Sequence, residues 1–260
     1  MKHSPLLAPT FALLLAALVG CGSSSSSSSS GPSVDAPGSA SAAILSAETH
    51  DALRVRVFYE PDQAPEPAAL AFLERRLLER VHKPGGVIVE QASQLAAPTQ
   101  LVRGEAEVRL LAATLPALPA ASEEGRYAID VLYLAGSSSA DEHGHETQLG
   151  LSVGARTIAV FAEEVRRSTT SSLGPVELEG ALLVHEAGHL LGLVGLGLPL
   201  TAPHADLTRP GHCVNSPCVM NARSPFWSGQ KIQLGIALTG GGPPDFCPDC
   251  QADLRAGGGL

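Results

Sequence analysis

No stretch of this sequence concentrates basic residues, and that absence limits the kind of partner to expect. The chain has 17 lysines and arginines against 26 aspartates and glutamates, a formal charge of −9 over 260 residues. Nucleic acids and anionic lipid surfaces are bound by dense clusters of positive charge. We therefore expect no nucleic-acid partner. A hydrophobic share of 44% with 17% charged residues is typical of a globular protein.

The sequence also lacks an early apolar run long enough to cross a bilayer comfortably. The run near the start covers residues 6–18, whereas a membrane helix needs about 20 residues. It ends in Leu18-Val19-Gly20-Cys21, a form typical of a bacterial lipoprotein signal. We expect residues 1–20 to be a signal peptide and Cys21 to carry the lipid, with a plain membrane anchor or an ordinary secretory signal as alternatives. Gly22 after the cysteine favours the outer membrane of a bacterial envelope.

The next residues have too little apolar content to fold. An unbroken serine run covers residues 23–30, and glycine, proline and serine follow it. Such a segment cannot bury enough apolar surface to offset the entropy of ordering it. We expect residues 21–45 to be a flexible tether and residues 46–260 to form one domain. The formal charge of the whole mature chain becomes −10 once Lys2 leaves with the signal.

The most informative stretch is residues 184–192, which contains the pattern H-E-x-x-H followed three residues later by glycine. Residues four apart lie on one face of a helix, so His185 and His189 can share one zinc ion. Glu186 lies about 100° further round the helix, where it can take a proton from water at the open position of the metal. The residues on either side are strongly apolar, so the helix is buried, and unpartnered histidine and glutamate side chains would be costly there. The pattern predicts a catalytic zinc helix over about residues 175–193, beginning at Pro175.

Hydrophobic periodicity predicts an α/β (α+β) fold. Strands with alternating or continuous apolar residues are expected at 53–59, 87–89, 127–134 and 157–162. Helices are expected at 67–82 and 105–115, and another is expected to begin near Asp245. This order favours a twisted mixed sheet covered by helices, including the zinc helix and a C-terminal helix.

The missing third zinc ligand decides the class of site, because two imidazoles do not hold a catalytic zinc. No glutamate follows Glu186, which excludes the thermolysin-like arrangement with a downstream glutamate ligand. The metzincin pattern H-E-x-x-H-x-x-G-x-x-H is matched through Gly192, but Gly195 stands where its third histidine would be.

Further along, a second motif carries a resemblance to a known family. Residues 212–220 read H-C-x4-C-x-M and a C-x-x-C follows at 247–250. Together with the zinc helix they resemble the archaemetzincin signature, with an insertion between Gly192 and His212 and a longer gap before the last two cysteines. The chain also resembles a group of metalloprotease-like envelope lipoproteins, through residues 193–197 (Leu-Val-Gly-Leu-Gly) and 204–206 (His-Ala-Asp).

The resemblance implies a metzincin-like zincin fold and assigns roles to single residues. It makes His212 the third zinc ligand and Met220 the residue of the Met-turn beneath the metal. His204 and Asp206 lie within the insertion and remain alternatives for the third ligand. The family implies a structural zinc bound by four cysteines, whereas an oxidising envelope favours disulfides, which we expect here. These cysteines are Cys213, Cys218, Cys247 and Cys250.

The sequence thus predicts a zinc metallopeptidase, either an endopeptidase or an aminopeptidase, acting on peptides or proteins. Zinc would polarise the peptide carbonyl, and Glu186 would activate water as general base. The alternative is a catalytically idle, zinc-stabilised binding lipoprotein, because glycine occupies the usual third-ligand position. Retention of Glu186 argues against it, since a purely structural site needs no base.

Overall fold

The computed structural model describes residues 35–117, 125–139, 148–169, 174–222 and 243–260. The predicted signal peptide, the lipidation site Cys21 and the serine run lie outside these residues. The described residues belong to one compact unit, which extends to Leu260. None of its described helices combines the length and the apolar character that crossing a membrane requires.

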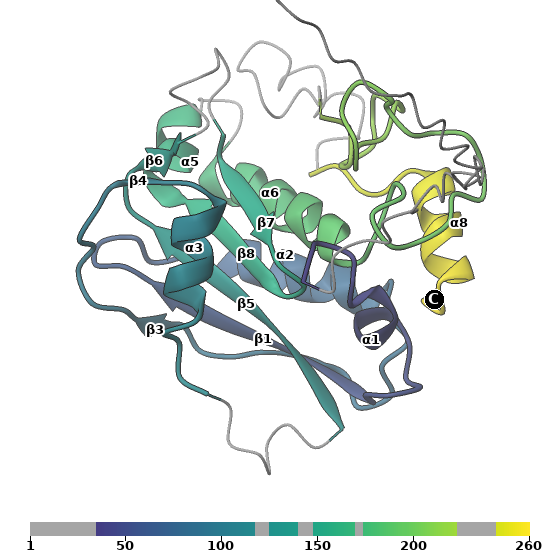
Figure 1. The fold of residues 1–260 in the computed structure, drawn as a ribbon, viewed down its shortest axis with the longest axis horizontal. Helices are drawn as coiled ribbons and strands as arrows, with labels where there is room; N and C mark the ends of the chain where they lie inside the picture. The colour runs from purple at the N-terminus through teal and green to yellow at the C-terminus, as the bar shows by residue number, and fades with distance from the viewer. Residues whose placement is uncertain (1–34, 118–124, 140–147, 170–173, 223–242) are drawn as a thin grey trace, which may run out of the picture. The chain divides into compact units, whose positions relative to one another are not determined.

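A mixed sheet forms the centre of the domain (Figure 1). Its path runs β2-β1-β5-β8-β7, and β3 also pairs with β1 beyond the end of β2. All of these pairings are parallel except β7 with β8, which is antiparallel and places β7 at one edge. The strands are β1 Ala52–Tyr59, β2 Val87–Val89, β3 Ser93–Gln94, β5 Arg126–Leu134, β7 Gly150–Val153 and β8 Thr157–Phe161. A separate pair joins β4 (Val102–Arg103) to β6 (Ser137–Ser138).

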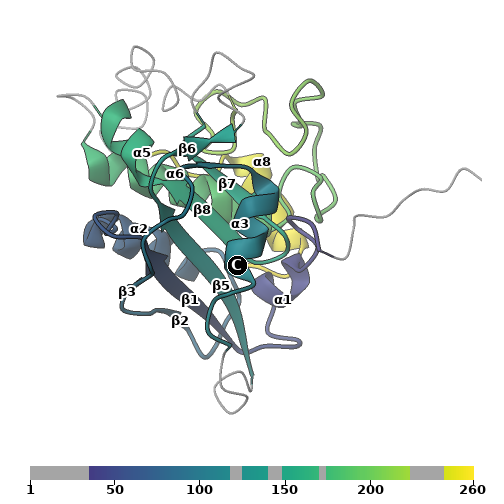
Figure 2. The same cartoon turned by 60° about the vertical axis from the view of Figure 1, so that its left-hand side comes forward.

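The two faces of the sheet bury different sets of side chains. Because neighbouring side chains on a strand point to opposite faces, Ile129 and Val131 of β5 join one core while Leu132 joins the other. The larger core lies between the sheet and the helices α2 (Pro67–Leu78) and α6 (Pro175–Leu190). Figures 1 and 2 show these two helices on one face and α3 (Glu105–Ala112) on the other.

The predicted mixed sheet, the helix that carries His185 and His189, and the C-terminal helix are confirmed. Three helices end earlier than predicted, α2 at Leu78, α3 at Ala112 and α6 at Leu190. The C-terminal helix α8 (Pro248–Ala256) starts after Asp245 because Pro248 occupies its first turn. The pattern missed the edge strand β7 and the short helix α5 (Ala162–Ser168), which directly continues β8.

The folded part of the chain begins before residue 46, earlier than the composition predicted. Helix α1 (Ser41–Leu45) lies within the segment expected to be tether, yet Ile44 and Leu45 are buried in the main core. Lys83 holds both this helix and the chain after it. Its ammonium group donates to the carbonyl oxygen of Ala43, within the helix, and to that of His50, each at 2.7 Å. The two apolar residues Ile44 and Leu45 thus anchor the end of the Ser/Gly/Pro-rich segment to the domain.

Gly192 ends the zinc helix and turns the chain towards the insertion. It has a φ of +81°, a conformation that favours glycine. Its N–H donates to His189 O at 3.0 Å and the N–H of Leu193 donates to Gly188 O at 3.1 Å, which is the hydrogen-bond pattern of a Schellman motif. The glycine of the sequence motif therefore serves as a helix terminator.

Candidate metal centres

Two imidazoles converge on one side of α6. His185 and His189 are four residues apart, their ring centroids are 4.7 Å apart, and their Nε2 atoms are 3.1 Å apart. Two nitrogens bound to one tetrahedral zinc at 2.0–2.1 Å would be separated by about 3.3 Å. The helix alone therefore places two nitrogen atoms at nearly the spacing of a shared ion.

His212 completes this group, which we call the imidazole site. Its ring centroid lies 5.3 Å from that of His185 and 5.0 Å from that of His189. One nitrogen from each of the three rings lies within 4.8 Å of the others. Of the three candidates for the third ligand, His212 is thus the one that the fold brings to the α6 pair.

The other two candidates lie elsewhere. His204 is buried beside the cysteines, with Nδ1 3.3 Å from Cys213 Sγ. The carboxylate of Asp206 accepts from the backbone N–H of Thr208 at 2.9 Å and from its hydroxyl at 2.6 Å, within its own turn. Gly195, at the position of the third histidine in the shorter motif, has a φ of +81°. Apart from its chain neighbours, none of the described residues lies within 4 Å of where its Cβ would be.

Backbone carbonyls fix the orientation of two of the three rings. His185 Nδ1 lies 2.7 Å from Val219 O, and His212 Nδ1 lies 3.0 Å from Pro210 O. A carbonyl can only accept, so each Nδ1 carries the hydrogen and each Nε2 presents a lone pair. Burial lowers the pKa of all three imidazoles, and the neighbouring imidazoles lower it further for His185 and His189.

The donor set fits zinc. Three neutral imidazoles with convergent nitrogen atoms are one of the ligand sets of catalytic zinc. His189 Nδ1 is buried and has no hydrogen-bond partner in the described part of the chain, and the described contact of its Nε2 is with Nε2 of His185 at 3.1 Å, the nitrogen with which it would share the ion. The three residues could therefore hold one zinc ion with a fourth position open.

Glu186 lies next to the first histidine and is buried. Ser152, on the edge strand β7, donates its hydroxyl to Glu186 Oε2 at 2.8 Å and lies 2.7 Å from Glu186 O. Burial raises the pKa of Glu186 to about 7, and the hydrogen bonds from Ser152 oppose part of that rise. A carboxyl group with a pKa near neutrality can both accept and return a proton.

Met220 packs against α6 at Gly188, the residue before His189. It is fully buried, and a Cβ added to Gly188 would meet its sulfur at 2.3 Å. The preceding residue, Val219, supplies the carbonyl that orients His185. The segment 219–220 thus supports the floor of the imidazole site from the side of the chain that also carries His212.

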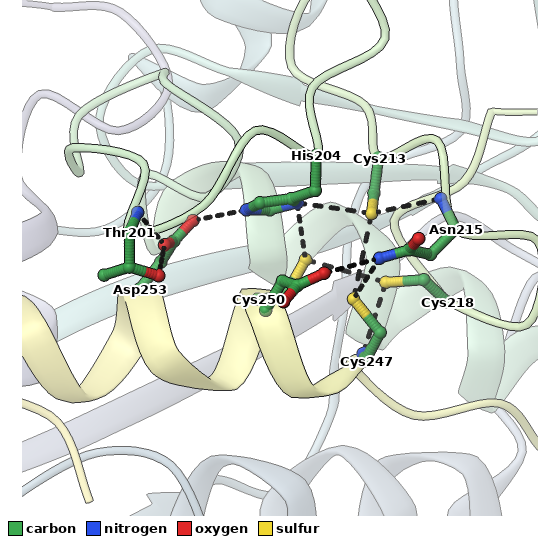
Figure 3. Close-up of polar contacts among 9 residues, drawn as sticks. Thr201, His204, Cys213, Asn215, Cys218, Cys247, Cys250 and Asp253 are labelled. Atoms are coloured by element: carbon green, nitrogen blue, oxygen red, sulfur yellow. Dashed lines mark hydrogen bonds and ion pairs between the residues drawn. The ribbon is translucent and has the colours of Figure 1, made fainter.

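A second group of donors, which we call the thiol site, lies between the insertion and α8 (Figure 3). Cys213 Sγ is 3.8 Å from Cys247 Sγ, and Cys218 Sγ is 3.6 Å from Cys250 Sγ. All four cysteines are buried and carry free thiols. Nδ1 of His204 lies beside two of them, and Asp253 lies behind this histidine.

The expectation of disulfides is not met. A disulfide needs an S–S distance of about 2.05 Å, far below the separations found in either pair. The sulfurs instead converge on one point together with an imidazole, an arrangement that suits a shared ion. As the motif implied, the cysteines join the segment bearing His212 and Met220 to the C-terminal helix.

Several site residues had no signal in the sequence. Ser152 lies in a strand of four residues, Gly150–Val153, which is too short for a clear pattern. Asp253 lies in the last helix, far along the chain from His204, although its 0% exposure marks it as unusual for a carboxylate. Val219 contributes only its backbone. Contacts of this kind depend on tertiary structure.

No protein-family profile and no curated protein matches the chain. Among solved structures it is similar to an archaemetzincin from Methanopyrus kandleri, with 20% sequence identity and a TM-score of 0.48. The alignment covers 81% of this chain and 96% of that one. That protein belongs to the group whose signature the histidine and cysteine motifs resemble.

Proposed function

We propose that this protein is a zinc-dependent metallopeptidase. The observation that carries the proposal is the imidazole site, in which nitrogen atoms of His185, His189 and His212 converge beside the buried carboxyl of Glu186. Three neutral nitrogen ligands leave zinc a position for water, and an adjacent carboxyl is not needed where zinc is only structural.

Each residue has a part in the proposed reaction. Zinc held by the three imidazoles would supply Lewis-acid chemistry, polarising the peptide carbonyl and making water more acidic. Ser152 occupies Oε2 of Glu186, so Oε1 is the oxygen that takes the proton from the attacking water. The same carboxyl then returns the proton to the leaving amine. The pKa of about 7 suits both steps.

A catalytically idle binding lipoprotein is the second candidate. The observation that favours it is the open backbone at Gly195, where the shorter motif has its third histidine. Such a protein would bind zinc with the same residues and would not hydrolyse peptides.

Substitution of Glu186 by glutamine separates the two candidates. The change keeps the side-chain shape and removes the proton acceptor, so the variant should bind zinc like the wild type. General acid–base assistance is worth about 10²–10⁴-fold, so hydrolysis across a broad peptide library should fall by at least that factor. Zinc content and cleavage products are measured on the same samples.

Glu177→Gln, in the first turn of the same helix, is the matched control and should cleave like the wild type. Equal rates for the wild type and Glu186→Gln would refute the mechanism. A wild-type protein that holds zinc in the imidazole site and cleaves nothing in the library would favour the idle binding protein.

We further propose that the enzyme is held on the bacterial envelope, at the outer membrane, by a lipid on Cys21. The support is the sequence Leu18-Val19-Gly20-Cys21 and the serine-rich segment after it. Wild type and the control Ser23→Ala should incorporate labelled fatty acid and sediment with membranes, and Cys21→Ser should do neither. Equal labelling of Cys21→Ser would contradict the anchor.

A further inference from the structure

The thiol site contains more donors than a four-coordinate ion can use. Four sulfur atoms and the imidazole of His204 meet there, and Figure 3 shows them arranged around one centre above the start of α8. The ligand atoms of His204, Cys213, Cys247 and Cys250 all lie within 4.8 Å of one another. A tetrahedral ion would bind only four of these five donors.

Asp253 determines how His204 is oriented. His204 Nε2 lies 2.8 Å from Asp253 Oδ2, and both side chains are almost fully buried. The other oxygen of Asp253 accepts from the backbone N–H and the hydroxyl of Thr201, both at 2.7 Å. Because Nε2 donates to the carboxylate, Nδ1 is the ring nitrogen left to face the cysteines, and in a neutral ring it presents a lone pair.

That lone pair points at sulfur atoms. Nδ1 lies 3.3 Å from Cys213 Sγ and 3.8 Å from Cys250 Sγ. In a tetrahedral zinc site with Zn–S near 2.3 Å and Zn–N near 2.0–2.1 Å, ligand atoms are separated by about 3.6 Å for N–S and about 3.8 Å for S–S. The spacings around His204 Nδ1 match this geometry, as does the 3.8 Å between Cys213 Sγ and Cys247 Sγ.

Binding through four cysteines would leave His204 in a different state. Its Nδ1 would then need a hydrogen to donate to a thiolate while Nε2 still donates to Asp253, so the ring would be a buried cation. Binding through His204 needs no added charge. A carboxylate that holds the far nitrogen of a histidine is also the usual support of a histidine metal ligand. Cys218, whose sulfur accepts the Cys247 N–H at 3.4 Å, is then the donor left outside.

We propose that the thiol site binds a zinc ion through His204, Cys213, Cys247 and Cys250, with Asp253 orienting the histidine and Cys218 as a neighbouring thiol. This assignment departs from the four-cysteine zinc that the motif resemblance implies. It also makes the insertion a structural element, because His204 would connect it to α8 through the ion.

Paired substitutions distinguish the two ligand sets without reference to peptide hydrolysis. Zinc is counted per chain in the His185→Ala/His189→Ala background, where only the thiol site should hold metal. His204→Ala should lose the ion and Cys218→Ser should retain it, with the exposed His82→Ala as a control. His204→Cys, which supplies a thiolate in place of the imidazole, guards against loss by misfolding and should keep the ion.

Zinc-edge X-ray absorption on the same background gives the ligand atoms directly. We expect three sulfurs and one nitrogen before substitution, and four sulfurs in His204→Cys. Asp253→Asn should weaken zinc binding by about 10–100-fold, measured by competition with a chelator. Four sulfurs in the unsubstituted thiol site, retention of zinc by His204→Ala with loss in Cys218→Ser, or no zinc at all in this site would each overturn the proposal.

Discussion

Two buried carboxyl groups on α6 share a raised pKa but differ in how they are held. Burial raises the pKa of Glu179 and of Glu186 to about 7. Glu179 is fixed between elements, because its Oε1 accepts from Tyr133 OH at 2.8 Å and from the Glu66 N–H at 3.0 Å. The side chain of Glu186 is held by Ser152 alone among the contacts described. Glu179 is therefore suited to joining α6 to β5 and to the start of α2, whereas Glu186 is suited to proton transfer.

Glu179 should make stability depend on pH. Its pKa is about 7 in the folded protein against 4.5 without the fold, so between these values the folded protein holds a proton that the unfolded chain has released. Stability therefore falls as pH rises through this window, by up to about 3 kcal/mol. Glu179→Gln does not titrate and should lose this dependence, as measured by denaturant unfolding from pH 4.5 to 7.5.

The comparison is between the variant and the wild type at each pH, because the histidines also titrate there. Glu179→Gln should gain stability relative to the wild type as pH rises, and Glu177→Gln controls for the loss of one negative charge. A difference that stays constant from pH 4.5 to 7.5 would show that Glu179 has no raised pKa.

At the scale of the element, two glycines, one within α6 and one just after it, allow other parts of the chain to pack closely against the helix. Gly192 terminates the helix, as its positive φ requires. Gly188 lies between the two zinc-ligand candidates, where Met220 and Phe246 occupy the space of a Cβ. The absence of a side chain at this position allows the Met220 segment to approach the helix and to orient His185 through Val219.

Gly188→Ala should therefore destabilise the protein and loosen the imidazole site. The new methyl group would lie 2.3 Å from the Met220 sulfur and 3.0 Å from a ring carbon of Phe246. Overpacking of this kind costs about 1–3 kcal/mol, and the better helix propensity of alanine offsets about 1 kcal/mol. Chemical denaturation of both single variants and of Gly188→Ala/Met220→Ala measures the coupling, expected at about 0.5–3 kcal/mol. Strict additivity of the two substitutions would rule out the predicted clash.

On the scale of the whole molecule, the two candidate metal centres share one short segment. His212 belongs to the imidazole site and the adjacent Cys213 belongs to the thiol site. Backbone hydrogen bonds hold this segment in place. The N–H of Cys213 donates to Met220 O at 2.9 Å, and the N–H of Asp206 donates to His212 O at 2.7 Å. The thiol site thus anchors the segment that presents the third ligand to α6.

Removing metal should lower the stability of the whole domain. Zinc that binds the folded state alone, at a free concentration 100 times its Kd, contributes about 2.7 kcal/mol per site. For a domain of this size each kcal/mol shifts Tm by about 2–4 °C, so a chelator should lower Tm by about 5–11 °C for one site and more for two. Thermal unfolding followed by circular dichroism checks this, and added zinc should restore the original Tm. An unchanged Tm after complete removal of zinc would mean that neither site supports the fold.

The sequence by itself determined the features that depend on local spacing. Apolar patterns predicted strands β1, β2, β5 and β8 of the central sheet, and a four-residue spacing on an apolar helix predicted that His185 and His189 would lie together. The motif resemblance favoured His212 as the third ligand, but spacing alone left His204 and Asp206 as alternatives, because a loop of this length can bring any of the three to the helix.

The tertiary structure decided which residues meet across long distances in the chain. It placed His212 beside the α6 pair and His204 among the cysteines, and it brought Asp253 behind His204. It also held the sulfurs apart as free thiols, where composition and the expected compartment had favoured disulfides. The physical reason is that spacing along one helix fixes direction at short range, whereas the partners of a loop are chosen by the packing of the elements around it.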